Sequence, residues 1–595
     1  MPRRPINTYF RRLPRTLGFL SGLFLAGLLP ALAFPLARPA AGAERVTLSY
    51  GFVEISTSVA SLREYAESGK VNDELAPYLR FLSAEQRSQF RTVLQAQQNI
   101  SPVEVSQFLY SSIGGGILRS LGTIVRTQSR RNGAKGLRGA LVLAAAEPDG
   151  LSALGVIEKF PTDTVRIDSQ GVFQAIGGFS ELITSTRTAL AAIEAQAEPI
   201  GALKSASSLP DLAQPGPYGV ETQTLTVVDS GRDRTLSVDL YLPMSSSAAV
   251  LTRSAPLVIA SHGLAGDRRG FAVIGKHLAS HGFAVAALDH PGSDRAQFEA
   301  LLTGSTQEIA DPTEFSERPR DVSYLLDELT RLNVANGPLA NRLDMEKIGI
   351  IGHSFGGYTA LALAGAKLDF DTLQANCNSP KLIFNAADPS MLLQCTALEA
   401  PEQFSENLRD ERIQSVMAMN PITSSVFGPA GFSQLAVPSL LVAGSADPIA
   451  PALLEQIRPF IWLSEAQPSI FNDPSNGIEL ADSSEHYLAL IEGGSHLYEA
   501  LELDNTDVSF ANSLVSPDIG LSDRYLKALS LGFMQMTIAN NPDYQNAFTS
   551  SSIVKLGQPP LPLYVISSLT EEMLRPVPEI ATDPAVELSP TESSP

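Results

Sequence analysis

The sequence predicts an α/β protein in which a doubly wound, mostly parallel sheet follows a smaller α-rich domain. From about Val220 onward, short apolar segments typical of buried strands alternate with helical stretches, which is the pattern of a parallel sheet covered by helices. The preceding region, from Glu44 to about Ser205, is mainly helical in pattern. The chain of 595 residues is also too long for one compact core, so two folded units with further segments outside them are expected.

The composition is that of a globular protein, with 44% hydrophobic and 18% charged residues. The formal net charge is −20 at pH 7. Because a strongly negative protein repels polyanions, this charge speaks against nucleic acid and anionic membrane surfaces as electrostatic partners. It is compatible with a lipid substrate, or with peripheral membrane contact, if recognition is mainly apolar.

Residues 1–43 have the form of a signal peptide. They contain six arginines and no acidic residue, and most of the arginines precede an apolar stretch from Leu17 to Leu36. Ala41-Gly42-Ala43 fits an A-x-A cleavage site, so the mature chain would begin near Glu44 and be exported to the periplasm or the cell exterior. The alternative is an uncleaved membrane anchor, because the apolar stretch is nearly long enough to span a bilayer.

The α-rich domain is expected to cover residues 44–205. Its helical segments are Glu54–Ser68, Glu74–Leu82, Ala84–Gln98 and Ala175–Ala197. Ser83, followed three residues later by Gln86, predicts a capping box at the start of the third of these helices. The domain contains no histidine and no cysteine, so it lacks the usual ingredients of a catalytic site. Residues 206–218 contain three prolines and a glycine, which indicates a linker.

The α/β domain is expected to span residues 219–540. Two alternating segments around Ser230-Gly231 predict an antiparallel edge hairpin, formed by Thr222–Val228 and Thr235–Tyr241. The buried-type strands that follow are Leu257–Ala260, Ala284–Leu288, Ile348–Ile351, Ser415–Ala418, Ser439–Val442 and Tyr487–Ile491. After residue 540 the chain becomes Pro-rich and acidic, and residues 541–595 are predicted to form a partly disordered tail.

Two insertions interrupt the alternation of strands and helices, at residues 366–411 and 451–485. The first contains several apolar residues and is interpreted as a lid over the active site, with a surface excursion around its own small core as the alternative. It also contains both cysteines, Cys377 and Cys395. In an exported protein these two residues would form a disulfide, whereas two free buried thiols are the alternative.

Residues 349–358 predict a nucleophile elbow at Ser354. The apolar run Met345–Ile351 is typical of a buried strand, and the Ala- and Leu-rich run Tyr358–Lys367 is typical of a helix. Between them lies Gly352-His353-Ser354-Phe355-Gly356, a G-x-S-x-G turn whose small flanking residues allow a strained backbone to expose a serine hydroxyl. An ordinary Gly-Ser turn is disfavoured, because strand, turn and helix occur in the required order.

A serine nucleophile needs a histidine base, and the base needs an acid that fixes its tautomer. His496 follows the last predicted strand in the loop Gly493-Gly494-Ser495-His496, and Asp447 follows the strand Ser439–Val442. The chain order Ser354, Asp447, His496 is the one expected of α/β-hydrolases, and it differs from the orders of chymotrypsin-like and subtilisin-like proteases.

Other roles are open to the residues around this triad. Asp447 could instead cap a helix before Pro448. His486 is a rival base, but it precedes the strand and lacks the glycines that surround His496. His353, next to the serine, is expected to orient neighbouring loops.

The tetrahedral intermediate of acyl transfer also needs two N–H donors. One is expected from Phe355, the residue after the nucleophile. The other is expected from Leu264, which lies in the loop Ser261-His262-Gly263-Leu264-Ala265-Gly266 after the strand Leu257–Ala260.

This loop, the segment from His277 to Ala286 and the elbow together resemble the plasma-type platelet-activating factor acetylhydrolase family and, more distantly, the dienelactone hydrolases, over roughly residues 218–535. The resemblance implies an α/β-hydrolase fold and hydrolysis of short or oxidised acyl esters on phospholipids, without calcium or another metal. It also implies that Ser354, Asp447 and His496 are catalytic, with Leu264 and Phe355 as oxyanion donors. The α-rich domain of residues 44–205 resembles a domain that precedes such hydrolases in cyanobacteria.

The leading hypothesis is an exported serine carboxylic-ester hydrolase that acts on lipid-like or short acyl esters through an acyl-enzyme and uses no cofactor. A peptidase, an amidase or a polyester hydrolase could use the same triad, because specificity depends on the surrounding loops. The non-enzymatic alternative is an envelope binding protein in which the helical domain carries the function. A complete triad and an oxyanion loop in the right order argue against it.

Overall fold

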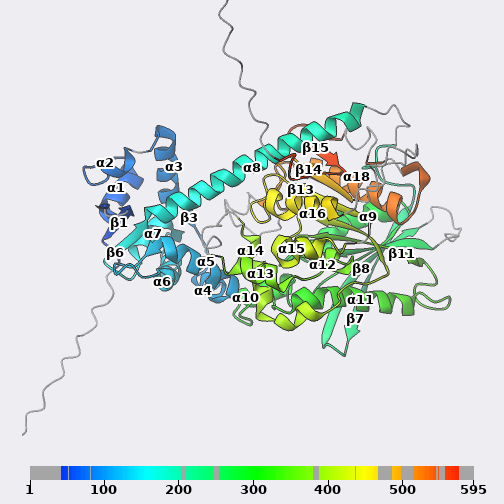
Figure 1. Cartoon of the computed structure of the whole chain (residues 1–595). Coiled ribbons are helices and arrows are strands. Elements are labelled where there is room, and N and C mark those ends of the chain that lie inside the picture. Colours follow the sequence, from blue (N-terminus) through cyan, green and yellow to red (C-terminus); the bar gives the residue numbers. More distant parts are fainter. Residues whose placement is uncertain are drawn as a thin grey trace, which may run out of the picture. The chain divides into compact units, whose positions relative to one another are not determined.

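Figure 1 shows a computed structural model of the chain, which describes residues 42–50, 53–80, 82–202, 210–244, 254–379, 388–435, 437–466, 486–497, 514–544, 547–548 and 556–574. The predicted signal peptide, apart from its last two residues, lies outside the described residues. Among the helices that are described, none combines the length and the apolar character needed to cross a bilayer.

The leader, residues 42–168, folds as helices around a small sheet. Its strands, in the order β2-β1-β6-β4, are β1 (Arg45–Tyr50), β2 (Val53–Ser58), β4 (Val125–Arg126) and β6 (Thr164–Asp168). A second sheet pairs β3 (Gln97–Gln98) with β5 (Leu151–Ser152). The helices are α1 (Val59–Ser68), α2 (Ala76–Leu79), α3 (Ala84–Gln95), α4 (Pro102–Tyr110), α5 (Ser112–Ile124), α6 (Ala134–Ala145) and α7 (Ala153–Glu158). The helices dominate as expected, but the sheets were not predicted.

The predicted helix Glu54–Ser68 differs most from the structure. Residues 54–58 belong to strand β2, because this alternating run with β-branched residues pairs antiparallel with β1. The helix α1 begins only after Ser58, whose hydroxyl accepts a hydrogen bond from the Ser61 N–H. The predicted capping box of α3 is present.

A single long helix, α8 (Ser169–Ala202), follows the leader and extends the predicted helix Ala175–Ala197 at both ends. Its C-terminal half contributes Ala189, Ile193 and Ala197 to the larger core of the α/β domain. Their spacing of four residues places the three side chains on one face of the helix.

The α/β domain is built on a sheet whose strands have the order β15-β14-β13-β12-β11-β9-β10-β8-β7 among the described residues. The strands are β7 (Gly219–Asp229), β8 (Arg234–Met244), β9 (Ala255–Ser261), β10 (Ala284–Leu288), β11 (Leu343–His353), β12 (Ile413–Met419), β13 (Ser439–Gly444), β14 (His486–Ile491) and β15 (Leu563–Ile566). Pairing is parallel from β10 through β14 and antiparallel at both edges. All the strands predicted for this domain are present, including the β7–β8 hairpin at one edge.

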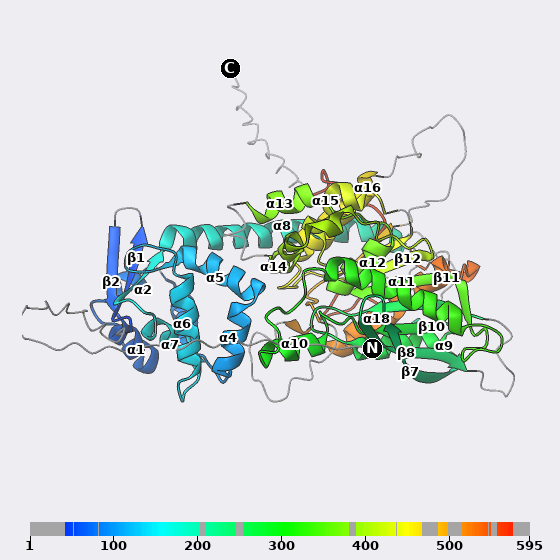
Figure 2. The same cartoon turned by 90° about the horizontal axis from the view of Figure 1, so that it is seen from below.

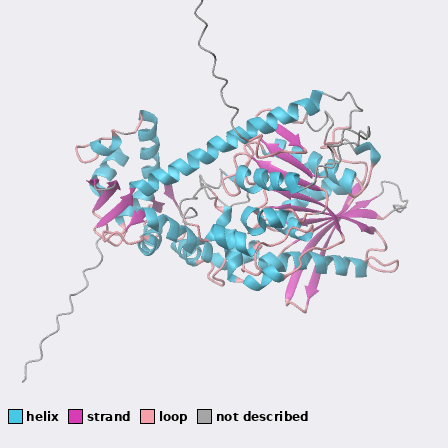
Figure 3. Cartoon of the chain, viewed as in Figure 1, coloured by secondary structure: helices cyan, strands magenta, loops and turns pink. Residues whose placement is uncertain are grey.

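Helices cover both faces of the sheet (Figures 2 and 3), so alternate residues of one strand enter different cores. In β9, Leu257 and Ile259 belong to one core, and Val258 and Ala260 belong to the other. The first core also includes residues of α11 (Glu314–Leu332), α12 (Phe355–Leu363), α15 (Ser424–Phe432) and α16 (Arg458–Ala466). The second includes residues of α9 (Ala272–Ser280) and α18 (Ile519–Thr537). Three further short elements are η1 (Arg268–Phe271), α10 (Arg295–Leu302) and η5 (Pro542–Tyr544). Phe271 of η1 belongs to the second core, and Tyr544 of η5 packs against it.

The first insertion packs on the main body of the domain. It contains α13 (Phe370–Cys377), α14 (Ser390–Gln394), η2 (Cys395–Glu399) and η3 (Pro401–Ser405), and residues 380–387 lie outside the described residues. Leu373, Leu393 and Ala397 are part of the larger core. The described part of the insertion therefore shares that core instead of enclosing one of its own. In the second insertion, η4 (Leu453–Ile457) precedes α16, and residues 467–485 are not described.

Cys377, at the end of α13, and Cys395, at the start of η2, form a disulfide, as predicted. The bond closes a loop with a sequence separation of 18 residues. Because this link restricts the unfolded chain, the double variant Cys377→Ala/Cys395→Ala is expected to have a free energy of unfolding about 3 kcal/mol lower. Chemical denaturation of the oxidised protein, the reduced protein and the double variant measures the effect. Identical transitions in all three samples would contradict it.

The C-terminal segment also departs from its prediction. β15 pairs antiparallel with β14, so the sheet extends into residues that were predicted to form a tail. The run Leu563–Ile566 contains residues that favour strands, but it is only four residues long and follows a Pro-rich stretch. Pairing with the edge of β14 orders it as a strand. Residues 575–595 of the predicted tail lie outside the described residues.

Candidate active site

Ser354 lies at the sharp turn between strand β11 and helix α12. Its backbone has φ 54° and ψ −115°, in a region that side-chain-bearing residues rarely occupy. A Cβ added at Gly352 would lie 2.0 Å from the carbonyl oxygen of Gly356, and one added at Gly356 would lie 2.0 Å from that of Ser261. The turn therefore requires glycine at both flanking positions, which is the arrangement predicted for a nucleophile elbow.

His496 connects Ser354 to Asp447. Its Nε2 lies 3.0 Å from the Oγ of Ser354, and its Nδ1 lies 2.7 Å from the Oδ2 of Asp447. The carboxylate can only accept from Nδ1–H, which leaves Nε2 able to accept the serine proton. The three residues follow the strands β11, β13 and β14, at the carboxyl edge of the parallel strands.

Four hydrogen bonds, including the one from His496, fix the orientation of the Asp447 carboxylate. Its Oδ1 accepts from the backbone N–H of Ile449 at 2.8 Å and of Ala450 at 2.9 Å. Its Oδ2 accepts from the Nδ2 of Asn420 at 2.7 Å, in addition to His496. Asp447 was alternatively expected to cap a helix, but the next helical element, Leu453–Ile457, has Ala452 as its N-cap. The carboxylate of Asp447 instead accepts from turn N–H groups and from the histidine.

Asn420 is part of this arrangement and was not predicted. It is fully buried directly after β12, and its Nδ2 also donates to the carbonyl oxygen of Ser495 at 2.9 Å. Its Oδ1 accepts from the Gly444 N–H at 3.2 Å. The side chain therefore ties the loop that carries His496 to the loop that carries Asp447. Its place after a predicted parallel strand was a signal, because the carboxyl ends of such strands meet at one edge of the sheet.

The two other histidines considered from the sequence have different positions. His353 lies 2.8 Å, through its Nε2, from the carbonyl oxygen of His496, and burial together with the nearby His496 lowers the pKa of His353 to about 4. A neutral His353 thus donates to the loop that carries the candidate base. His486 begins β14 and contacts the hydroxyl of Ser439 at the opposite, amino end of the parallel strands. The structure does not bring it to Ser354.

The burial of His486 predicts an acid-sensitive contribution to stability. Burial lowers the pKa of His486 to about 4, whereas in the unfolded chain it should titrate near 6.5. Between these values the unfolded state binds the proton more readily, so the contribution is present above pH 6.5 and is lost as the pH falls. Relative to His486→Asn, the wild type is expected to lose about 2 kcal/mol in its free energy of unfolding between pH 7 and pH 4.5. Urea denaturation of both proteins across this range measures the difference, and a difference independent of pH would contradict the assignment.

The two predicted oxyanion donors face the same region from different elements. Phe355 is the first residue of α12, so its N–H has no acceptor within the helix. The Leu264 N–H takes no part in the backbone hydrogen bonds of the described loops. A Cβ added at Gly263, the residue before Leu264, would lie 3.2 Å from the Cβ of Ser354. The loop of residues 261–266, here called the oxyanion loop, therefore runs directly beside the serine.

The arrangement can support nucleophilic chemistry at a carbonyl carbon. It combines a hydroxyl, a base in contact with it, an acid that orients the base and two amides near the hydroxyl. No group of three or more His, Cys, Asp or Glu side chains placed to hold a metal ion is found within the described part of the chain.

Two family models match the chain. The model described as alpha/beta hydrolase fold matches residues 256–371, which include the oxyanion loop and Ser354. The model described as alpha/beta hydrolase of unknown function matches residues 42–168, which form the leader and contain none of the triad.

Three curated relatives illustrate the similarity. The platelet-activating factor acetylhydrolase of Canis lupus familiaris is 32% identical over 139 residues, covering 18% of this chain and 31% of that protein. Cutinase est1 of Thermobifida alba is 28% identical over 157 residues, covering 26% of this chain and 44% of that protein. The cutinase of Thermobifida fusca (strain YX) is 30% identical over 112 residues, covering 19% and 29%. The chain thus spans less than half of the length of each of these relatives.

Proposed function

We propose that this chain, which belongs to the α/β-hydrolase superfamily, is a serine carboxylic-ester hydrolase. The observation that carries the proposal is the continuous set of hydrogen bonds from Ser354 through His496 to Asp447. The proposal is also supported by the backbone amides of Leu264 and Phe355, which belong to segments next to Ser354 and could serve as oxyanion donors.

Acylation would begin when the Ser354 Oγ attacks the ester carbonyl carbon and its proton passes to the Nε2 of His496. Asp447 would stabilise the imidazolium that forms, while the N–H groups of Leu264 and Phe355 donate to the oxyanion. The intermediate then collapses, the bond to the leaving alkoxide breaks, and Nε2 returns the proton to the departing alcohol. Water repeats the same proton path on the acyl-enzyme, so that the carboxylic acid is released and Ser354 is regenerated.

Short acyl or lipid-like esters are the proposed substrates. The support comes from the relative named platelet-activating factor acetylhydrolase, a name that refers to hydrolysis of an acetyl group. A polyester hydrolase is the second candidate, because two of the relatives above are named cutinases. The proposed location is the periplasm or the cell exterior, which rests on the arginine-rich, apolar residues 1–43 and agrees with a disulfide in the α/β domain.

The proposal is tested with the protein from Glu44 to its C-terminus. Hydrolysis of p-nitrophenyl esters from acetyl to palmitoyl is compared with hydrolysis of the matching p-nitroanilides, and a fluorophosphonate probe is mapped by peptide mass spectrometry. Turnover of esters with the label on Ser354 would support the proposal, and the preferred chain length would narrow the substrate. Faster turnover of anilides would favour an amidase. Release of soluble products from an insoluble polyester would favour the second candidate. No turnover and no label on Ser354 would overturn the proposed activity.

A further inference from the structure

A fully buried arginine of helix α11, Arg318, contacts backbone carbonyl groups of the oxyanion loop. The Nη1 of Arg318 donates to the carbonyl oxygen of His262 at 2.7 Å, and its Nη2 lies 3.5 Å from that of Gly263. These are the two carbonyls that precede Leu264, the candidate oxyanion donor. The planar fork of a guanidinium suits two such acceptors on successive residues.

The same guanidinium contacts the other donor segment. The Cζ of Arg318 lies 4.3 Å from the centre of the Phe355 ring. Phe355 supplies the second candidate amide, and its ring packs 4.8 Å, centre to centre, from that of Phe315, one helical turn before Arg318. One buried side chain therefore contacts both segments that would bind the oxyanion.

Peptide geometry links these contacts to the direction of the Leu264 N–H. In a trans peptide the C=O and the N–H point in opposite directions, so the group that holds the Gly263 oxygen also sets the direction of the Leu264 N–H. The Gly263 oxygen is held by the Gly266 N–H at 3.2 Å, by the Nδ1 of His262 at 2.7 Å and by the approach of Arg318. The Leu264 N–H therefore points away from these three donors.

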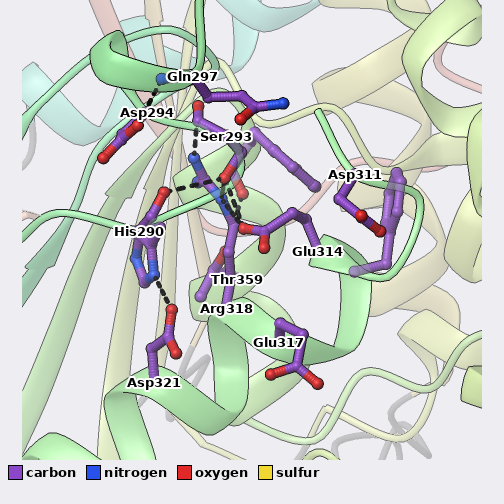
Figure 4. A network of polar contacts seen from close by, with 12 residues as sticks. His290, Ser293, Asp294, Gln297, Asp311, Glu314, Glu317, Arg318, Asp321 and Thr359 are labelled. Carbon is purple, nitrogen blue, oxygen red and sulfur yellow. Dashed lines mark hydrogen bonds and ion pairs between the residues drawn. The ribbon is translucent and has the colours of Figure 1, made fainter. Parts of the chain in front are cut away.

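Further contacts hold the guanidinium in place. The Nε of Arg318 donates to the Oγ of Ser293 at 2.8 Å, and the Ser293 hydroxyl donates to the Oε2 of Glu314 at 2.6 Å (Figure 4). The Oε1 of Glu314 in turn accepts from the Nη1 of Arg234 at 2.8 Å. The Ser293 carbonyl also accepts from the Ala265 N–H at 3.0 Å, which joins Ser293 to the oxyanion loop itself.

Arg318 remains cationic at neutral pH in this environment. Burial lowers the pKa of Arg318 to about 10, against the opposing effect of the Glu314 and Asp321 carboxylates. Burying such a charge is costly, and an apolar residue of similar volume is often at least as stabilising. Stability alone therefore does not explain an arginine at this position, whereas a role in orienting polar backbone does.

We propose that Arg318 is a positioning residue for the oxyanion hole, which orients the Leu264 amide through the His262 and Gly263 carbonyls and supports the Phe355 segment by stacking. The inference rests on the proposed ester-hydrolase function. It assigns to Arg318 no contact with the substrate and no part in proton transfer.

The test compares Arg318→Lys and Arg318→Met with Arg331→Lys, which alters an exposed arginine on the same helix. For a p-nitrophenyl ester, kcat is expected to fall about 10- to 100-fold in Arg318→Lys and about 100- to 1,000-fold in Arg318→Met, with KM changed less than threefold. Arg331→Lys should match the wild type. Circular dichroism and thermal unfolding establish that each variant is folded.

Two measurements distinguish a specific loss of oxyanion stabilisation from a general loss of order in the active site. The rate ratio between an oxoester and the matching thionoester should shrink in the Arg318 variants, because sulfur accepts hydrogen bonds weakly and gains little from the hole. Affinity for a trifluoromethyl ketone, which forms a tetrahedral oxyanion on serine, should fall by the same factor as kcat. If Arg318→Lys does not fold, Ser293→Ala is used instead, because it removes the acceptor of the Arg318 Nε. This variant should show smaller decreases in kcat, in the oxoester-to-thionoester rate ratio and in affinity for the ketone.

The outcomes distinguish this inference from the proposed function. Suppose that the wild type hydrolyses esters through Ser354, but the folded Arg318 variants have the same kcat or an unchanged oxoester-to-thionoester rate ratio. This result would contradict the role of Arg318 and would still support the proposed esterase activity. If the wild type shows no Ser354-dependent reaction with the ester, the ketone or the fluorophosphonate, both the proposed esterase function and the role of Arg318 are contradicted.

Discussion

Ser354→Ala is expected to lower kcat/KM for p-nitrophenyl acetate by about 10,000- to 1,000,000-fold. Alanine removes the Oγ that lies 3.0 Å from the Nε2 of His496, and no other described hydroxyl contacts that nitrogen. The substitution keeps a Cβ at a residue with φ 54°, so the backbone strain of the elbow is unchanged. The loss therefore reports on the missing hydroxyl and not on relaxation of the turn.

Steady-state kinetics and fluorophosphonate labelling of the same preparations measure this effect. Ser433→Ala is a matched control, because Ser433 is exposed and its hydroxyl has only local partners. It donates to the Ala430 carbonyl at 2.8 Å and accepts from the Nε2 of Gln434 at 3.4 Å. The control should retain activity and label. If Ser354→Ala kept more than a tenth of the wild-type rate, Ser354 would not be the nucleophile.

Asp447→Asn is expected to lower kcat by about 10,000-fold with a small change in KM. The two backbone N–H groups of Ile449 and Ala450 require an acceptor at the Oδ1 position, so the new amide must direct its NH₂ towards His496. A donor then faces the Nδ1 of His496, and the ring is driven to carry its proton on Nε2. In that tautomer Nε2 cannot accept the Ser354 proton.

The NH₂ of this variant would also face the Nδ2 of Asn420, which donates to the present carboxylate at 2.7 Å. Some loss of stability is therefore expected in addition to the loss of rate, and thermal unfolding must accompany the kinetics. Asp543→Asn, at an exposed acid, is the matched control and should behave as the wild type. A folded Asp447→Asn variant within tenfold of the wild-type kcat would show that another group orients the base.

Local sequence signals were sufficient for much of the fold and the site. The strands β9 to β14 are short apolar runs between helices, and each predicted run lies within the range that the structure assigns. Ser354, Asp447 and His496 each follow such a strand, and the carboxyl ends of parallel strands meet at one edge of a sheet. Topology therefore brings the three residues together without further information.

Other features depend on partners that are distant in the sequence. β15 and the leader strand β2 are short runs of residues that favour strands, and they form strands because β14 and β1 are available to pair with them. The insertion at residues 366–411 could not be assigned from composition, since only its contacts place Leu393 and Ala397 in the larger core.

The sequence was sufficient to predict the parallel strands, the sharp turn at Ser354 and the positions of Asp447 and His496 after strands, because apolar periodicity and glycine-lined turns are local properties of the chain. Only the tertiary structure revealed Asn420 and Arg318. Each acts through backbone groups of other segments, Asn420 on the loops of Asp447 and His496 and Arg318 on the oxyanion loop. A hydrogen bond to a backbone carbonyl leaves no trace in the identity of the residue that accepts it, so such positioning contacts are visible only after the chain has folded.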